Sequence, residues 1–170
     1  MTHPLYSASV PVFKQALGAL DAIISKTEKY AAEKKIEPDA LLQARLFPDM
    51  FPFVRQVQIA SDFVKSVPAR LASVDLPSYE DNERTFADLH ARIAKTLAFA
   101  SGIDAAKFVG SEQREIVLRP GTPRERRFAG GESYLLSYGI PQFFFHATTA
   151  YALLRHNGVP IGKQDYMGEG

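Results

Sequence analysis

The sequence predicts an all-α fold: a four-helix up-down bundle with a small β-hairpin inserted between the third and fourth long helices. Apolar residues recur at three- and four-residue spacings along four long segments, which is the period of amphipathic helices. The period changes around residues 114–128, where β-branched residues precede a turn rich in Pro and Gly. Because 170 residues suit one domain of ordinary size, we expect residues 1–170 to form a single domain.

The first two long helices each carry one apolar stripe. The first should cover residues 9–34, with Ser9 as its candidate N-cap. A short helical turn at 38–47 leads into a corner, and the second helix then runs to about residue 73. Pro68 should kink or end this second helix. The stripes consist of Phe13, Ala16, Leu17, Leu20, Ile23, Ile24 and Ala31 in the first helix, and Phe53, Val57, Ala60, Val64, Val67 and Leu71 in the second.

The second half of the chain contains the other two long helices and the hairpin. Gly139 and Pro141 interrupt the last helical region, so a short helix should precede the last long one. Four apolar stripes are buried best when the helices pack together as a bundle. The expected elements are a linker at 75–82, a third helix ending at about residue 101, the hairpin at 114–128, a last long helix at about 142–157 and a tail at 159–170.

Composition excludes several classes of protein. The chain has no Cys, which removes disulfides, thiolate nucleophiles and Cys-based metal sites, and which fits a reducing compartment. Its net charge of +1, from 20 basic and 19 acidic residues, gives no reason to expect nucleic acid or an anionic membrane as a partner. No apolar stretch approaches the ~18 residues of a membrane span. The start lacks a signal-peptide pattern, so we expect a cytoplasmic protein.

Two segments of the sequence resemble the bacterial family of unknown function DUF1993. They are Met50–Ala60, with the sequence MFPFVRQVQIA, and the longer Phe143–Lys163. This family is related to the DinB-like (YfiT-like) superfamily of metalloenzymes, whose fold is a four-helix bundle. Many members of that superfamily are homodimers, and some transfer low-molecular-weight thiols to electrophiles with a metal bound by three His. The resemblance therefore implies the same bundle and a homodimer.

The His pattern of the chain departs from that of the superfamily. There, two His lie one turn apart on the last helix and a third lies near the start of the second. Here Ala150 stands four positions after His146, and the second helix begins with Gln56 and Gln58 where a His would be needed. One imidazole of three remains, so we expect no cofactor. If a divalent metal binds after all, His146 is the candidate ligand.

His146 and Gln56 form a candidate polar pair. At about 100° per residue, His146 lies at the centre of the inward stripe of the last helix, with Thr149 nearby, and Gln56 lies beside the stripe of the second helix. Three interpretations stay open for His146: a buried imidazole that is simply hydrogen-bonded, a residue that contacts a ligand, and a metal ligand. The first is the favoured one.

Other polar residues are expected mainly on solvated faces. Asp62, with Gln58 and Lys65, should lie on such a face, although Asp62 could still line a groove. Candidate ligand-binding residues are thus His146, Gln56, Thr149 and Asp62. The hairpin carries a basic cluster that could bind an anion, but acidic residues interleave with it, which favours a solvated hairpin. The cluster comprises Arg114, Arg119, Arg124, Arg126 and Arg127.

Phe144 and Tyr151 lie on the outer face of the last helix, roughly opposite His146. Aromatic residues on an outer face predict a homodimer interface, unless the tail or the hairpin covers them.

Two function classes remain, so whether the protein is an enzyme stays open. One is a small-ligand-binding or structural relative without the metal triad. The other is a metal-dependent, thiol-transferase-like enzyme that uses His146 in a depleted site.

Overall fold

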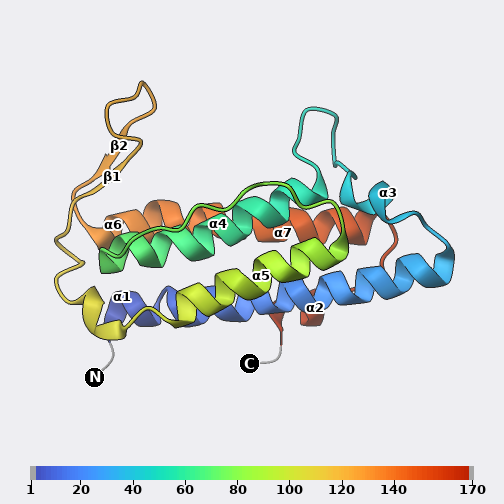
Figure 1. Ribbon diagram of the computed structural model, residues 1–170, viewed down its shortest axis with the longest axis horizontal. Coiled ribbons are helices and arrows are strands. Elements are labelled where there is room, and N and C mark those ends of the chain that lie inside the picture. Colours follow the sequence, from blue (N-terminus) through green and yellow to red (C-terminus); the bar gives the residue numbers. More distant parts are fainter. Residues whose placement is uncertain (1–2, 169–170) are drawn as a thin grey trace.

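A computed structural model describes residues 3–168 of the chain, and its long helices lie side by side along the longest axis (Figure 1). The fold is mostly helical, with one antiparallel two-stranded hairpin. The elements are α1 (Pro4–Ser7), α2 (Val10–Lys34), α3 (Pro38–Leu42), α4 (Phe53–Ala72), α5 (Phe86–Ser101), η1 (Ala105–Phe108), β1 (Ile116–Leu118), β2 (Arg126–Phe128), α6 (Gly131–Tyr134), the π-helical turn η2 (Leu135–Gly139), α7 (Ile140–His156) and α8 (Lys163–Met167).

The ends of the long helices follow from local chemistry, with one correction. Thr85 and Asp88 form a reciprocal capping box at the start of α5. Ser9 was expected to cap α2, but its hydroxyl donates to the carbonyl oxygen of Leu5 at 2.5 Å instead. The reason is that α1 lies directly before α2, so a carbonyl group of α1 is within reach of the Ser9 side chain.

Pro68 does not end the second long helix. Helix α4 runs through Pro68 to Ala72. Its neighbours Val64, Val67 and Leu71 are completely buried in the common core. Proline removes one backbone hydrogen bond from a helix interior, but burial of this apolar face keeps the following turn in place.

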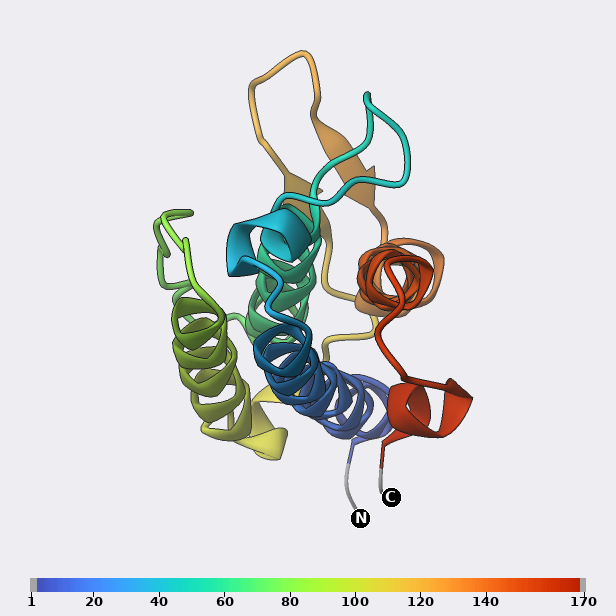
Figure 2. The same cartoon turned by 90° about the vertical axis from the view of Figure 1, so that its right-hand side faces the viewer.

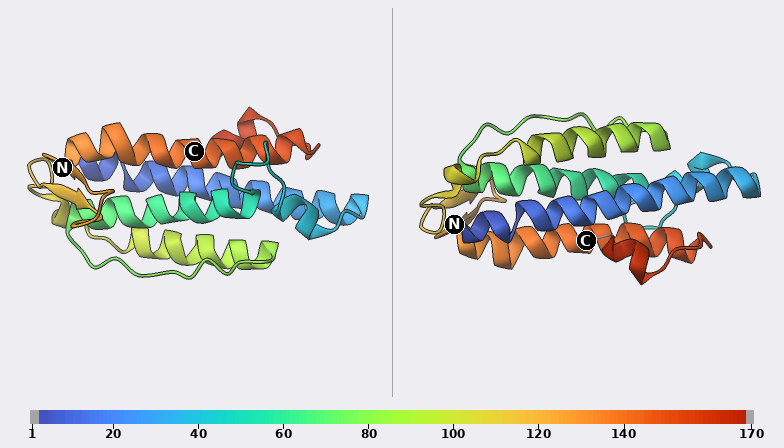
Figure 3. Two further views of the ribbon diagram at one scale, coloured as in Figure 1. Left: turned by 90° about the horizontal axis from the view of Figure 1, so that it is seen from above. Right: turned by 90° about the horizontal axis from the view of Figure 1, so that it is seen from below.

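The order of helix directions differs from the expected up-down order. Helices α2 and α7 run one way along the bundle, and α4 and α5 both run the other way (Figures 1 and 3). Residues 73–85, which carry no helix or strand, return along the outside of the bundle from the end of α4 to the start of α5. We call this segment the crossover. Seen end-on, α4 lies beside α2, α5 and α7 (Figure 2).

The hairpin prediction is confirmed, and the interruption before the last helix takes an unexpected form. Strands β1 and β2 pair antiparallel, with Ile116 opposite Phe128. Instead of a break at Gly139, the π-helical turn η2 leads directly into α7, and Pro141 lies in the first turn of α7. Within residues 3–168, none of the helices could span a membrane.

Candidate functional site

His146 and Gln56 meet in the buried space between α7 and α4. The Nδ1 atom of His146 lies 2.7 Å from Oε1 of Gln56, and both side chains are buried. The amide nitrogen of Gln56 donates to the carbonyl oxygen of Phe51 at 3.2 Å, so its oxygen faces the imidazole. This assignment makes Nδ1 the protonated ring nitrogen and leaves a lone pair on Nε2.

Aromatic rings surround the imidazole. Phe63 stacks on His146 with ring centroids 6.1 Å apart, and Phe145 meets it edge-on at 5.1 Å. Burial, and to a smaller extent the positive charge of Arg55, together lower the pKa of His146 from 6.5 to about 4. The imidazole is therefore neutral at physiological pH. In this state it can accept a hydrogen bond or a proton through Nε2.

The other two candidate ligand-binding residues lie apart from this pair. The hydroxyl of Thr149 donates to the carbonyl oxygen of Phe145 within α7, at 2.6 Å. The carboxylate of Asp62 lies 3.0 Å from Arg92 of α5 and 3.2 Å from Lys65 of its own helix, α4. The structure thus brings together two of the four predicted residues.

The donor set around His146 does not fit a tight transition-metal site. Such sites in proteins take three or four side-chain ligands. Here the neighbour of His146 is an amide whose oxygen is already hydrogen-bonded to Nδ1. In the part of the chain that the structure describes, no three His, Asp or Glu residues gather so that they could hold a metal ion.

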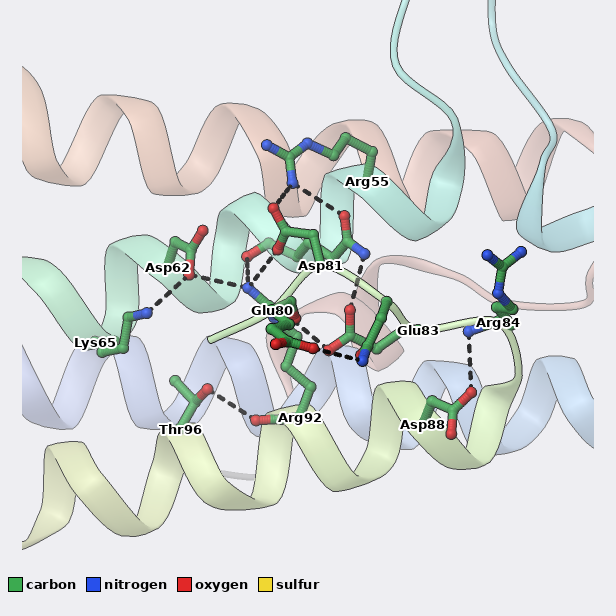
Figure 4. A network of polar contacts seen from close by, with 12 residues as sticks. Arg55, Asp62, Lys65, Glu80, Asp81, Glu83, Arg84, Asp88, Arg92 and Thr96 are labelled. Atoms are coloured by element: carbon green, nitrogen blue, oxygen red, sulfur yellow. Dashed lines mark hydrogen bonds and ion pairs between the residues drawn. The ribbon is translucent and has the colours of Figure 1, made fainter. Parts of the chain in front are cut away.

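A second polar cluster, centred on Arg92, lies between α4, α5 and the crossover (Figure 4). The guanidinium of Arg92 is completely buried, and it pairs with Glu83 at 2.9 Å, with Asp62 at 3.0 Å and with Asp81 at 3.0 Å. Burial opposes the charge of Arg92, but its hydrogen bond to Glu83 and the negative charges of the three carboxylates outweigh burial and raise its pKa. Two of these three partners belong to the crossover.

The crossover also buries residues that were expected in solvent. Gln58 is only 4% exposed and Lys65 only 6%, so their placement on a solvated face was wrong. The amide of Gln58 donates to Glu83 at 2.8 Å, and the ammonium of Lys65 lies 4.0 Å from the ring centroid of Tyr79. The reason is tertiary: the crossover covers this face of α4. Its contacts fasten an otherwise irregular segment to the bundle.

Sequence reasoning missed Arg92, although a signal was present. Arg92 follows Leu89 by three positions and directly precedes Ile93, so it falls on the inward stripe of the third helix. A charge on an apolar stripe calls for a buried partner. The acidic run Glu80-Asp81-Asn82-Glu83, shortly before this helix, supplies two of the three carboxylate partners.

The outer stripe of α7 is partly covered by the C-terminal helix. Tyr166 of α8 hydrogen-bonds to Thr148 at 2.8 Å and meets the ring of Tyr151 edge-on at 5.6 Å. Phe144 packs edge-on against Phe143, and both Phe144 and Tyr151 are half-buried against the core of their own chain. The tail therefore covers part of the face on which a homodimer was expected.

The helical bundle and its inserted hairpin define a helical protein with a DinB-like fold. The crystal structure of a DinB family member protein from Shewanella denitrificans is similar at a TM-score of 0.90 and 39% sequence identity, over 98% of this chain and 93% of that chain. The chain belongs to the family described as "Domain of unknown function (DUF1993)", whose model matches residues 5–167. No curated protein matches the chain.

Proposed function

We propose that this protein binds a small molecule beside His146 and does so without a resident metal. The observation that carries the proposal is the fixed, neutral imidazole. Gln56 is hydrogen-bonded to Nδ1, which leaves the lone pair of Nε2 of His146 to accept a hydrogen bond from a ligand. No residue in the described part of the chain hydrogen-bonds to Nε2, and Nε2 is not among the fully buried unpaired atoms. The ligand would donate a hydrogen bond to Nε2.

The aromatic residues next to the imidazole support a ligand that also has an apolar part. Phe145, whose ring meets the imidazole edge-on, is an exposed residue, and so is Phe51, whose backbone carbonyl accepts the hydrogen bond from Gln56. Ligand sites typically combine such apolar surface with a few fixed polar groups. A purely structural role for the pair would not need exposed phenylalanine residues beside it.

A thermal-shift screen of small molecules tests the proposal. The reference is the double variant Gln56→Leu/His146→Leu, which removes both polar partners together and leaves no buried amide unpaired. A ligand at one hundred times its Kd should raise the Tm of the native protein by roughly 5–10 °C. The Tm of the variant should not change. If no compound distinguishes the two proteins, the binding proposal is wrong.

The metal-free part of the proposal has its own measurement. Elemental analysis of protein purified without an affinity tag or chelator should give far less than one transition-metal ion per chain. The alternative function, a metal-dependent thiol-transferase-like enzyme, requires about one. Stoichiometric metal that disappears in His146→Leu would replace our proposal with that alternative.

The cytoplasmic location expected from the sequence stays a prediction.

A homodimer through the outer face of α7 is also a proposal. It rests on the half-buried rings of Phe144 and Tyr151 and on the resemblance to a superfamily with many homodimers. One chain has a mass of 18.8 kDa, and light scattering should give twice this value. Tyr151→Glu should shift the protein to monomer, whereas Phe145→Glu, the same charge change on another face of α7, should not. A monomer at every accessible concentration would rule the interface out.

A further inference from the structure

The structure sorts the five hairpin arginines into two groups. Arg127 forms ion pairs with two neighbouring carboxylates, that of Glu125 at 2.7 Å and that of Glu115 at 3.3 Å. Arg114 donates to the carbonyl oxygen of Leu71. The remaining three have no carboxylate within 4.0 Å among residues 3–168, although acidic residues interleave with them in the sequence. These three are Arg119, Arg124 and Arg126.

The three unpaired arginines line one small cavity together with Tyr138 and Gln142. The cavity measures about 110 Å³, which is the space of a few water molecules at roughly 30 Å³ each. No acidic side chain lines it. Three arginines that line so small a cavity bring like charges close together, and an anion bound among them would relieve their repulsion. Their planar donor forks match the oxygens of a phosphate group.

The cavity adjoins the His146 site. Gln142 precedes His146 by four positions on α7, which is one helical turn. A row of aromatic rings also connects them: Arg126 lies 5.7 Å from the ring centroid of Tyr138, and Phe63 lies between Tyr138, at 5.8 Å, and His146, at 6.1 Å. Tyr138 belongs to the π-helical turn η2, and such turns are frequent at functional sites.

We propose that the cavity of Arg119, Arg124 and Arg126 binds the phosphate group of a small phosphate monoester, whose organic part extends along α7 to His146. This names the ligand class for the site and so rests on the proposed function. The arginines bind the phosphate oxygens. The neutral imidazole accepts a hydrogen bond from the organic part, and Phe63 and Tyr138 supply apolar surface between the two ends.

The first experiment uses inorganic phosphate alone, titrated at constant ionic strength. NMR signals of the arginine Nε–H groups follow the binding. Saturable shifts are expected for Arg119, Arg124 and Arg126. Arg126→Gln should weaken binding about ten-fold or more, the loss expected for one charge-assisted contact. Arg119→Gln is a second variant with the same expectation.

Arg127→Gln is the matched control. It removes the same charge from the adjacent position of the same strand, but Arg127 is already paired with Glu115 and Glu125. This variant should weaken phosphate binding less than two-fold. Equal losses of phosphate affinity in Arg126→Gln and Arg127→Gln would mean that phosphate binding depends only on the net charge of the protein. This result would overturn the cavity as a binding site. So would the absence of saturable binding.

The second experiment adds 4-hydroxyphenyl phosphate, whose phenolic O–H can donate a hydrogen bond to the imidazole, and observes the imidazole signals of His146 as well. This ester should shift both the arginine and the His146 signals, while inorganic phosphate should shift only the arginine signals. Phosphate binding without any effect of the ester on His146 would overturn the link between cavity and imidazole and leave the arginine cavity standing. Failure of the phosphate titration alone would overturn the cavity and leave the His146 proposal to its own screen.

Discussion

Replacing Arg92 with Met is expected to lower the free energy of unfolding by about 3–5 kcal/mol, which is the usual cost of removing one partner of a buried ion pair. The physical reason lies with Glu83. Its side chain is only 4% exposed, whereas those of Asp62 and Asp81 are 39% and 38% exposed and can turn to water. Without Arg92, the Glu83 carboxylate keeps a buried charge with no cation beside it. Urea unfolding followed by circular dichroism measures the loss.

Two further variants make this test specific. Arg127→Met removes an arginine that is 58% exposed and also paired with two carboxylates, so it should change the free energy of unfolding far less than Arg92→Met does, because exposed ion pairs contribute little. Adding Glu83→Gln to Arg92→Met removes the stranded charge and should restore part of the lost stability. A loss in Arg92→Met as small as that in Arg127→Met would show that the cluster does not fasten the crossover.

Acidification is expected to destabilise the protein through His146. The pKa of His146 falls from 6.5 in an unfolded chain to about 4 in the folded protein, so between these two values the unfolded state binds more protons. Stability contributed by the neutral imidazole is fully present above pH 6.5. It declines as the pH falls toward 4, by roughly 3 kcal/mol in all.

The double variant Gln56→Leu/His146→Leu isolates this effect from the carboxylates that titrate at lower pH. The difference in unfolding free energy between the native protein and this variant should fall between pH 6.5 and 4. A difference that stays constant over this range would mean that His146 titrates alike in both states. In that case the imidazole is not desolvated. An NMR titration of the imidazole signals gives the folded-state pKa directly.

The pairing of Gln56 with His146 shows how far sequence periodicity reaches. Each residue lies on or beside the inward stripe of its own helix, and the stripes of α4 and α7 pack together in the bundle. A stripe position fixes which way a side chain points, because the helical period is rigid over a few turns. Thr149 was placed near the same stripe, but a hydroxyl this close to its own backbone bonds there instead.

The path of the crossover could not be predicted in the same way. Residues 73–85 carry no periodic pattern, and a chain of this length can either turn back or return along the bundle. The second path makes α4 and α5 parallel. It places Glu83 against Gln58 and Arg92, and Tyr79 against Lys65, so that these three residues of α4 and α5 are buried. Ion pairs between distant parts of the chain favour this path, and such pairs leave no local signature.

The long helices, the hairpin and the inward placement of Gln56 and His146 could be predicted because they follow from local periodicity and composition, and the family could be predicted from the resemblance of two segments. Which polar groups meet depends on the tertiary structure. It separated Arg127, with its two glutamates, from the three arginines that face the cavity, and it left Nε2 of His146 beside that cavity's aromatic row. The physical reason is that the energy of a charge depends on its partners and on its burial, and both are set by segments far away in the chain.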